Sequence, residues 1–426
     1  MPARPDLLAR LAERVAAREA EHGLRRLRTA LRGEGARIVL DGRELLDFAG
    51  NDYLGLANHA AVRAALVECA ARAGVGATAA HLLGGHRPEH EALEREIAEF
   101  LGRERALLFC SGYAANLGVM QALLGPGDLC VQDKLDHASL LDGARLANCE
   151  AKRYPHGDAD GARRQLEARP GAAALLASDG VFSMDGDVAP LAALAAVARD
   201  TGATLMVDDA HAVGVLGAQG RGSVEHARLS PAEVPVHVVT LGKALGAAGA
   251  LVAGSAALVD GLVQFARTFV YSTAMPPALA AAAHAALRVA RHEDWRRDRL
   301  QRLVAHFRRG AARRGIALSP STTPIQPLPV GDADRAVRIS RALEAAGFYV
   351  PAIRAPTVPP GQARLRITLS AGHTETDVEA LLDALGVALA ADRDPDATDA
   401  TPAPAPPSQA KRAPRSSPRG NARRRR

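Results

Sequence analysis

The sequence is poor in cysteine and in aromatic residues, and it lacks long apolar runs. Its four cysteines show neither Cys-x-x-Cys spacing nor the density of a disulfide-rich secreted domain. No apolar run is long enough to span a bilayer, and the first residues lack the apolar segment of a signal peptide. These absences argue against a secreted scaffold and against a membrane protein, so we expect a reduced, cytoplasmic enzyme.

Acidic residues are missing from the last part of the chain. The formal net charge is +6, but the segment from Ala400 onward carries one lysine, seven arginines and no acid, so the rest of the chain is close to neutral. This segment is rich in proline and has few residues that could form a core, so we expect residues 392–426 to be a disordered basic tail. No aromatic residues separate its arginines for base stacking, and nucleic acid is therefore not the expected partner.

The body of the chain alternates apolar strands with helical patterns. At 426 residues and 48% hydrophobic content it can bury a large core and is long enough for two or more domains. The alternation predicts an α/β fold in which a mostly parallel sheet is covered on both faces. We expect strands at 106–110, 129–132, 173–178, 204–208, 236–240 and 250–254, and helices that include 88–102 and 190–200.

The pattern changes after Pro277. A long helical stretch at 278–314 leads into a smaller α+β pattern, with strands at 325–330, 349–353 and 364–370 and helices at 333–346 and 375–389. The first fifty residues contain an arginine-rich helix and short strands at 36–40 and 44–48. We therefore divide the chain into an N-terminal part (1–50), a large domain (51–290), a small C-terminal α+β domain (291–391) and the tail.

Two charged residues follow strands that should be buried. Lys243 lies in a turn of small residues after 236–240, and Asp208 ends the strand 204–208. A lysine amine held in this way can form a Schiff base with an aldehyde cofactor, and a buried carboxylate can keep a pyridinium nitrogen protonated. These are the two protein groups that pyridoxal phosphate (PLP) chemistry requires. Each is weak evidence alone, because a Gly-Lys turn is common and a buried aspartate is also found in internal salt bridges.

Other polar residues follow other strands of the predicted sheet. Gly112 and Tyr113 open a helix whose free N–H groups can hold a phosphate, although an ordinary tight turn has the same pattern. His137, Ser183 and His211 also come shortly after predicted strands. A capping histidine and a turn serine are the simpler interpretations of His137 and Ser183. Because ligands of open α/β sheets bind at the carboxyl ends of the strands, we expect these residues at one site.

Several short strings occur in the order and spacing of a known family. They are 51–56 (NDYLGL), 111–116 (SGYAAN), 136–139 (DHAS), 181–187 (VFSMDGD), 208–211 (DDAH), 240–243 (TLGK) and 271–277 (YSTAMPP). With these strings the chain, from about residue 6 to 390, resembles the α-oxoamine synthases among the fold-type I PLP enzymes. The resemblance implies PLP as cofactor, no metal, a large α/β/α domain with a smaller α+β domain, and a homodimer that completes its site across the subunit boundary.

Two further strings point to a branch of that family. Residues 325–332 (IQPLPVGD) and 355–366 (APTVPPGQARLR) are most similar to the branch that joins L-alanine to a pimeloyl thioester, on coenzyme A or an acyl-carrier protein, with loss of CO2 on the path to biotin. The glycine-using relatives have similar strings and remain an alternative. The chain departs from the family at 76–81 (GATAAH), where a Gly/Ser-rich stretch is usual. The extra methyl groups would either narrow the site or shift the loop.

The resemblance also implies roles for single residues. Lys243 would hold PLP and act as the base, Asp208 would hold the ring nitrogen, and His137 would stack on the ring. Ser183 and His211 would lie near the ring hydroxyl, with His211 counted among the catalytic residues. The phosphate would be held by Gly112, Tyr113, Thr240, and Ser272 and Thr273 of the partner subunit.

The substrate groups follow in the same way. Arg366 would bind the carboxylate of the amino acid, with Asn51 and His137 beside it, because a planar guanidinium suits a bidentate contact. Arg25 and Thr357 would contact the acyl substrate, although a solvated helix face also explains Arg25.

Three other functions remain to be weighed. An aminotransferase or decarboxylase on the same fold would use the same cofactor without a thioester. A binding protein without cofactor would use the basic tail on nucleic acid. A dinucleotide-dependent oxidoreductase is disfavoured, because no Gly-x-Gly-x-x-Gly opens a helix after the first strand.

Overall fold

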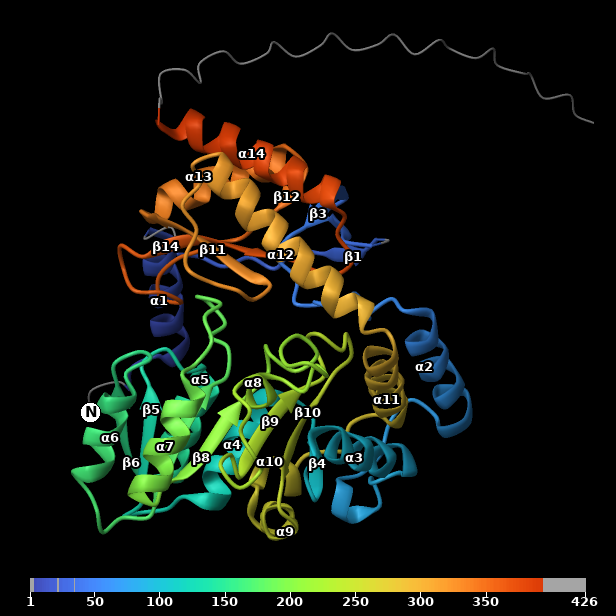
Figure 1. Cartoon of the computed structure of the whole chain (residues 1–426), viewed down its shortest axis with the longest axis vertical. Coiled ribbons are helices and arrows are strands. Elements are labelled where there is room, and N and C mark those ends of the chain that lie inside the picture. Colours follow the sequence, from blue (N-terminus) through green and yellow to red (C-terminus); the bar gives the residue numbers. More distant parts are fainter. Residues whose placement is uncertain (1–3, 21–22, 34, 394–426) are drawn as a thin grey trace, which may run out of the picture.

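The computed structural model describes residues 4–20, 23–33 and 35–393, and they form two lobes (Figure 1). The tail that we predicted to be disordered lies, from residue 394 onward, outside the described residues. No helix in the described part of the chain is long and apolar enough to cross a membrane.

A seven-stranded sheet forms the centre of the larger lobe. Its strand order is β4-β10-β9-β8-β7-β5-β6, and among the described strands of this sheet β10 alone runs in the direction opposite to the others. The prediction of a mostly parallel α/β sheet is therefore confirmed. The strands are β4 (Arg105–Phe109), β5 (Leu129–Asp133), β6 (Glu150–Tyr154), β7 (Ala174–Asp179), β8 (Thr204–Asp208), β9 (Val236–Thr240) and β10 (Ala250–Gly254).

Six of these seven strands were predicted within one residue at each end. The strand that we missed is β6, which lies at the edge of the sheet and reads Glu-Ala-Lys-Arg-Tyr. Three of its five residues are exposed, so it has none of the apolar continuity that marks the buried strands.

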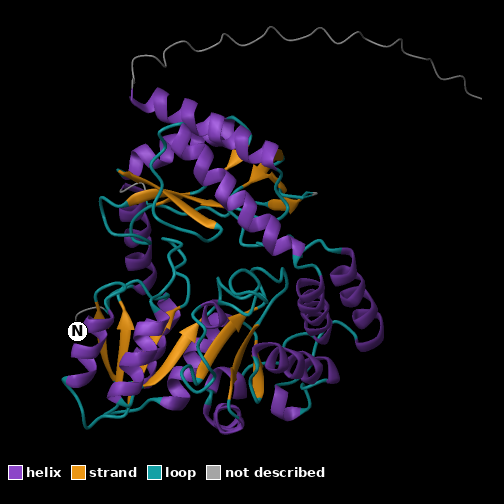
Figure 2. Ribbon diagram, in the orientation of Figure 1, coloured by secondary structure: helices purple, strands orange, loops and turns teal. Residues whose placement is uncertain are grey.

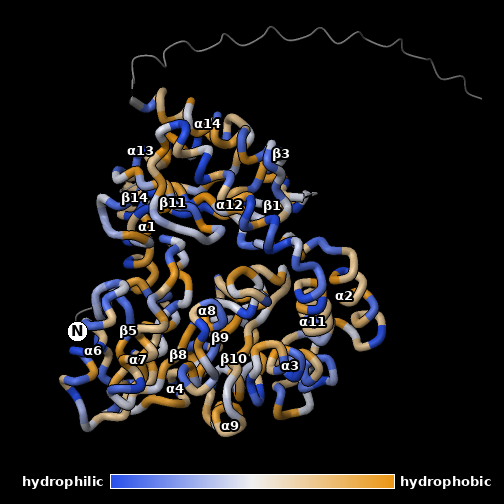
Figure 3. Tube along the Cα trace, viewed as in Figure 1, coloured by the Kyte–Doolittle hydropathy of each residue, from blue (hydrophilic) through white to orange (hydrophobic). Residues whose placement is uncertain are grey.

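Helices cover both faces of this sheet, because successive side chains of each strand point to opposite sides (Figure 2). In β8, Met206 packs on one face while Leu205 and Val207 pack on the other. Figure 3 shows apolar residues concentrated along these strands. One face carries α4 (Gly112–Leu123), α5 (Ala138–Ala147), α9 (Ala256–Phe265) and α10 (Arg267–Val270), and the other carries α3 (Pro88–Leu101), α6 (Ala159–Glu167) and α7 (Leu191–Thr201).

The smaller lobe combines both ends of the described chain. Its sheets are β11-β14-β13 and β1-β2-β3-β12, and the parallel pairing of β12 with β3 joins the N-terminal strands to the C-terminal segment. The strands are β1 (Ala30–Arg32), β2 (Arg37–Leu40), β3 (Arg43–Asp47), β11 (Ile325–Gly331), β12 (Phe348–Tyr349), β13 (Ala352–Ile353) and β14 (Ala363–Thr368), and the helices are α13 (Ala333–Ala345) and α14 (Glu375–Arg393).

Two predictions in this half of the chain need correction. The single strand expected at 349–353 is two short strands in different sheets, separated by Pro351, which has no N–H for a ladder. The long helix expected at 278–314 is also divided, into α11 (Pro277–His292) and α12 (Trp295–Arg313). Before the break, α11 packs against α2 (Ala60–Ala73) and α3 in the large lobe. After it, α12 packs against α14 in the small lobe.

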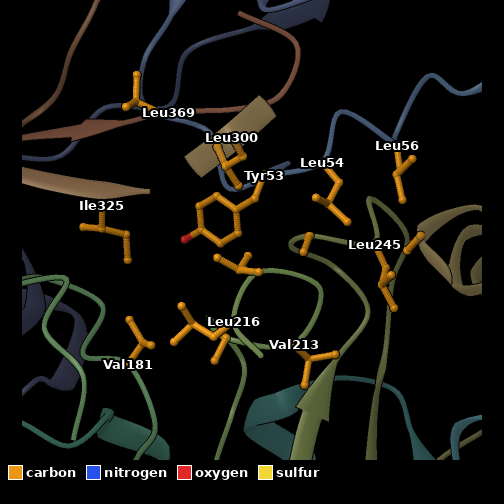
Figure 4. Close-up of a cluster of buried hydrophobic side chains, with 14 of the residues drawn as sticks. Tyr53, Leu54, Leu56, Val181, Val213, Leu216, Leu245, Leu300, Ile325 and Leu369 are labelled. Carbon is orange, nitrogen blue, oxygen red and sulfur yellow. The ribbon is translucent and has the colours of Figure 1, made fainter. Parts of the chain in front are cut away.

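The remaining helices are short or peripheral: α1 (Leu7–Ala20), η1 (His81–Leu83) and α8 (Ser223–His226). One apolar core runs through both lobes. Figure 4 shows Tyr53 at its centre, between Val181 of the large lobe and Ile325 and Leu300 of the small lobe. This continuous core fixes the position of each lobe against the other.

Truncating Phe48 should test this core. Phe48 is fully buried and stacks on His373 with ring centroids 4.1 Å apart. Because Phe48→Ala removes a large side chain from a packed site, we expect a loss of about 3–5 kcal/mol in unfolding free energy, measured by urea denaturation. Leu31→Ala, at a residue 65% exposed, is the matched control and should cost less than about 0.5 kcal/mol. Equal midpoints for the two variants would contradict the proposed role of Phe48.

Candidate active site

A cavity of about 320 Å³ lies where the strands of the large lobe end. It brings together nine of the residues that we predicted from the sequence, although they come from widely separated segments. These residues are Asn51, Gly112, Tyr113, His137, Ser183, Asp208, His211, Thr240 and Lys243.

The other predicted residues lie elsewhere. Arg366 and Thr357 line a second cavity of about 1000 Å³, which shares His211 and Lys243 with the first. Arg25 lines a third cavity, of about 780 Å³. Ser272 and Thr273, which we expected to act on a partner's site, line neither of the first two cavities within this chain, and their role remains a prediction.

Lys243 is held by a tight turn that follows β9. The N–H of Leu241 donates to the carbonyl of Gly249 (2.9 Å), and the N–H of Gly246 donates to the carbonyl of Lys243 itself (2.9 Å). Gly246 has φ +61°, and a Cβ there would lie 2.3 Å from the backbone nitrogen of Ala57. Only glycine satisfies both conditions, so the second glycine of the string is a structural requirement of the turn.

The surroundings of the Lys243 amine favour its neutral form. Burial lowers the pKa of Lys243 to about 8, against the attraction of the carboxylates of Asp208 and Asp179, which raise it; the guanidinium of Arg366 lowers it further. A lysine with this pKa carries an appreciable fraction of free amine near neutral pH, as a nucleophile or a proton acceptor requires.

Asp208 lies at the end of β8 and is fixed through both carboxylate oxygens. Oδ2 accepts a hydrogen bond from Nδ2 of Asn116 (2.6 Å), and Oδ1 accepts one from the N–H of Ala210 (3.1 Å). The same Asn116 nitrogen donates to Oγ of Ser139 (2.8 Å), which lies 2.6 Å from Nδ1 of His137. A buried chain of contacts therefore links the carboxylate to the imidazole.

Sequence reasoning gave no role to Asn116 or Ser139, although both lie in the strings of the family resemblance. The available signal was a polar amide at a buried helical position, since Asn116 is fully buried in α4. His137 itself begins α5 as its N-cap, so the capping interpretation also holds, because its Nδ1 accepts from the N–H of Ser139 (3.3 Å).

His211 is held by a residue that we did not predict for the site. Oη of Tyr53 lies 2.7 Å from Nδ1 of His211 and donates to Oδ1 of Asn51 (3.2 Å). Burial lowers the pKa of His211 well below its usual range, and the cations of Lys243 and Arg366 add to this shift, so the imidazole is neutral. Burial also raises the pKa of Tyr53 to about 12, which keeps the phenol protonated.

Arg366 reaches the site from β14 of the small lobe. Its Nε donates to the carbonyl of Ser183 (2.7 Å), and its remaining nitrogens donate to Oδ1 of Asn51 (3.2 Å) and to Oγ1 of Thr368 (3.1 Å). The expected neighbourhood of Arg366 and Asn51 is therefore present, and the guanidinium is held in a fixed plane.

Arg25 and Thr357, 332 positions apart in sequence, meet at the surface between the lobes. A guanidinium nitrogen of Arg25 donates to Oγ1 of Thr357 (3.2 Å), and both residues are exposed. Both were predicted to contact the same substrate, so this proximity agrees with a shared role.

Two buried carboxyl groups near Asp208 were not predicted. Asp136 accepts hydrogen bonds from the N–H groups of Asp133 and Asp179 (2.9 Å each). Burial raises the pKa of Asp136 and of Asp179 well above the usual range. The charges of Asp133 and Asp208 raise the pKa of Asp136 further, and those of Asp136 and Asp208 raise the pKa of Asp179. Asp179 lines the first cavity, and among the described atoms its Oδ1 has no hydrogen-bond partner. The floor of the site therefore holds a carboxyl group with spare hydrogen-bonding capacity.

The segment 76–81, where the sequence departs from the family, is tied to the strand-like segment at 273–274. Ala80 forms an isolated bridge with Thr273, and the N–H of Ala274 donates to the carbonyl of Ala79 (3.0 Å). Thr78 has φ +66°, a conformation that a β-branched residue rarely adopts. Strain of about 1 kcal/mol or more is therefore stored beside the segment that we expect to reach the partner subunit.

A cluster of His81, His86 and His90 lies outside the cavities described above, with ring nitrogens within 4.8 Å of one another. In His90, Nδ1 accepts from the N–H of Arg87 (2.9 Å) and Nε2 lies 2.7 Å from the carbonyl of Met275. Both nitrogens of His90 are already hydrogen-bonded, so His90 has no free ring nitrogen for a metal ion.

The residues of the first cavity fit the aldehyde cofactor that the sequence led us to expect. Lys243 provides the amine, and Asp208 provides a carboxylate fixed by two donors. The N-terminus of α4, capped by Ser111 through a 3.1 Å hydrogen bond, provides N–H groups for a phosphate. Gly112, the first residue of this helix, approaches Thr240 so closely that a Cβ would lie 2.8 Å from its methyl group, so a larger residue would not fit there without a shift.

Comparisons with known proteins agree with this chemistry. Residues 43–385 match the family described as aminotransferase class I and II. The 8-amino-7-oxononanoate synthase of Xanthomonas campestris pv. campestris (strain 8004) is 57% identical over 384 residues, which cover 90% of this chain and 96% of that protein. The enzyme of the same name from Xanthomonas axonopodis pv. citri is also 57% identical, with the same coverage.

Solved structures show the same fold. Serine palmitoyltransferase of Sphingomonas wittichii superimposes with a TM-score of 0.87 at 30% identity and covers 91% of this chain and 99% of its own. The 8-amino-7-oxononanoate synthase of Francisella tularensis superimposes with a TM-score of 0.72 at 30% identity and covers 82% of this chain and 99% of its own. A variant of serine palmitoyltransferase from S. paucimobilis contains a bound PLP–myriocin aldimine. It matches with a TM-score of 0.87 at 27% identity, over 91% of this chain and 100% of its own.

The lowered pKa of Lys243 predicts a pH profile for its reaction with aldehydes. Reductive methylation of ligand-free protein by formaldehyde and cyanoborohydride should rise about tenfold per pH unit and level off above pH about 8, as followed at Lys243 by peptide mass spectrometry. In Asp208→Asn the midpoint should move lower, because the carboxylate that stabilises the ammonium is lost. Labelling that keeps rising to pH 10 would contradict this environment.

Proposed function

The chain belongs to the aminotransferase class I and II family, and from this premise we propose that it acts as an 8-amino-7-oxononanoate synthase of biotin biosynthesis. The reaction forms a bond between Cα of L-alanine and the acyl carbon of a pimeloyl thioester. The thiol leaves, the alanine carboxyl group is lost as CO2, and Cα takes up a proton. The carrier of the acyl group is coenzyme A or an acyl-carrier protein.

The observation that carries this proposal is the joint placement of Lys243, Asp208 and Arg366 around connected cavities. Lys243 and Asp208 are the pair that PLP chemistry requires, and Arg366 adds a fixed cation for a substrate carboxylate. The 57% identity to the Xanthomonas enzymes over most of the chain supports the choice of substrates.

We assign the cofactor groups as follows. PLP, when bound, supplies the electron sink for negative charge at Cα of the amino acid. Lys243 would hold it covalently, Asp208 would bind the ring nitrogen, and His137 would lie on the ring face. Ser183 and His211 would face the ring hydroxyl, and the phosphate would be held by Gly112, Tyr113 and Thr240, with Ser272 and Thr273 of the partner subunit.

Each residue then has a physical task in the reaction. The amine of Lys243, with a pKa of about 8, is suited to take the Cα proton and to return one after CO2 has left. Asp208 keeps a proton on the ring nitrogen, because its carboxylate is fixed by Asn116 and the N–H of Ala210. The neutral imidazole of His211, held by Tyr53, can accept or donate one hydrogen bond without adding a charge.

The substrates are assigned to the groups around these residues. Arg366 and Asn51 would bind the alanine carboxylate beside His137, and Arg25 and Thr357 would contact the acyl chain of the thioester. We further propose a cytoplasmic homodimer, and we keep the division into an N-terminal part (1–50), a PLP-binding domain (51–290) and a small domain (291–391) as the working description.

Thiol release from pimeloyl-coenzyme A tests the assignment. With PLP-loaded protein, release should depend strongly on L-alanine and be much slower with glycine or L-serine. Lys243→Ala should reduce turnover by at least about a thousandfold, since it removes both the anchor and the base. Keto-acid exchange without thiol release would instead indicate an aminotransferase, and release that prefers glycine would move the chain to the glycine-using relatives.

Replacing Arg366 by lysine tests the carboxylate site separately. A lysine keeps the charge but loses the planar pair of donors that now reach Ser183 and Asn51. We expect KM for L-alanine to rise about tenfold to a hundredfold, while KM for the thioester changes little; steady-state kinetics with each substrate varied in turn measure both. Equal increases for the two substrates would show that Arg366 does not act on the amino acid.

A further inference from the structure

The second cavity carries cations that the proposed reaction has not yet used. From Lys243 it extends past Phe182 and Met184 to Lys134 and Arg153 at the edge of the large sheet. We propose that Lys134 and Arg153 form a subsite for the phosphate of the pantetheine arm that carries the acyl group. This subsite rests on the proposed function and extends it, because both coenzyme A and an acyl-carrier protein present the same arm.

Backbone pairing places the two cations together. Lys134 follows β5 directly, and Arg153 lies in the edge strand β6, opposite Gln132. The guanidinium of Arg153 donates a hydrogen bond to the carbonyl oxygen of Lys134. Both side chains are exposed and both line the second cavity. A ligand in this cavity therefore meets two adjacent positive charges at the outer edge of the sheet.

Two other basic groups at this end of the cavity are neutralised, whereas Lys134 and Arg153 are not. Arg364 is paired with Asp185, and His156 is paired with Asp133 and Asp187. Among the described residues, no carboxylate forms an ion pair with Lys134 or Arg153.

The one other carboxyl group that lines this cavity weakens the positive potential very little. That group is Asp136, whose pKa burial raises well above the usual range. The edge of the cavity therefore suits an anionic group, and a phosphate offers more acceptor oxygens than a carboxylate.

The acyl thioester has two anionic groups, the phosphate of the pantetheine arm and the carboxylate of the pimeloyl chain. Distances along the sheet favour the phosphate as the ligand of Lys134 and Arg153. Lys243 follows β9, and four strand spacings separate β9 from β6, which amounts to roughly 19 Å. A pantetheine arm has about thirteen bonds between sulfur and phosphorus and extends ~16 Å at about 1.2 Å per bond. The pimeloyl chain has about six bonds beyond the acyl carbon and extends only ~7 Å. The pimeloyl chain is therefore too short to place its carboxylate beside Arg153 when its acyl carbon lies at the reacting centre.

The walls of the second cavity between Lys243 and the two cations suit a pantetheine arm. They are mostly apolar, as the methylene and methyl groups of pantetheine require, and the side chains of Leu141, Phe182, Met184 and Val358 contribute to them. Gln362 also lines the cavity and offers an amide to the amides of the arm. The shorter pimeloyl chain would then extend toward Arg25 and Thr357, as proposed above.

Kinetics with full and truncated thioesters test the subsite. The double variant Lys134→Gln/Arg153→Gln should raise KM for pimeloyl-coenzyme A about tenfold, with kcat unchanged, and remove most of the increase of KM with salt. KM for the pimeloyl thioester of N-acetylcysteamine, which has no phosphate, should be the same in the variant and the wild type. Lys152→Gln is the matched control, because Lys152 lies in the same strand, is paired with Glu150 (3.1 Å) and does not line the cavity.

Two further donors identify the bound group. The pimeloyl thioesters of phosphopantetheine and of holo acyl-carrier protein should show the same rise in KM in the double variant. A rise with coenzyme A alone would assign the cations to its nucleotide phosphates and overturn the proposal. An equal rise with the truncated thioester would do the same, because the effect would then arise from the acyl chain or from the fold.

Direct binding separates this subsite from the overall reaction. Coenzyme A itself should bind the PLP-loaded wild-type protein in calorimetry and bind the double variant about tenfold more weakly, whatever amino acid the enzyme uses. If coenzyme A binds both proteins equally, the subsite is wrong even where thiol release succeeds. If thiol release fails while coenzyme A binding still depends on Lys134 and Arg153, the proposed function fails and the subsite stands.

Discussion

Lys243 and Asp208 line the same cavity, and much of the large lobe serves to hold them in place there. A buried carboxylate is costly unless it is bonded, and Asp208 meets this condition through Asn116 and the N–H of Ala210. Lys243 is held by a turn that only Gly246 can close. Because β8 and β9 are parallel neighbours, their carboxyl ends lie on the same side of the sheet. Asp208 and Lys243, which are separate in sequence, therefore reach the same site.

The small lobe contributes what the large lobe lacks, a fixed cation for a substrate. Arg366 crosses from β14 to bond the carbonyl of Ser183 and the side chain of Asn51. Such contacts hold their geometry only if the lobes do not shift, and the core that runs through Tyr53 and Ile325 meets this requirement. On the proposed assignments, the residues that would act on the cofactor come mainly from the large lobe, whereas the small lobe would supply the group that selects the amino acid.

Sequence reasoning reached the strands and their ends because both leave a local signal. The strands β8, β9 and β10 have the predicted bounds, since short apolar runs ending in polar residues are typical of a buried parallel sheet. The edge strand β6 and the pairing of β12 with β3 leave no such signal, because they depend on contacts between distant segments. For the same reason the reasoning found Asp208 and His211 but not Asn116 or Tyr53, whose roles exist only through the partner atoms that they bond.

The backbone alone does not decide which acyl donor this site accepts. Serine palmitoyltransferase and 8-amino-7-oxononanoate synthase share the fold, and the former superimposes on this chain at least as well as the latter. The difference must lie in side chains along the substrate path, which begins at Lys243 and ends at the edge of the sheet. With the proposed substrate on this path, Arg25 would meet its acyl end at the surface between the lobes, and Lys134 with Arg153 would meet its pantetheine phosphate beside β6. An acyl chain without a terminal carboxylate would leave Arg25 without an anionic partner, so this side of the path favours a dicarboxylic acyl group.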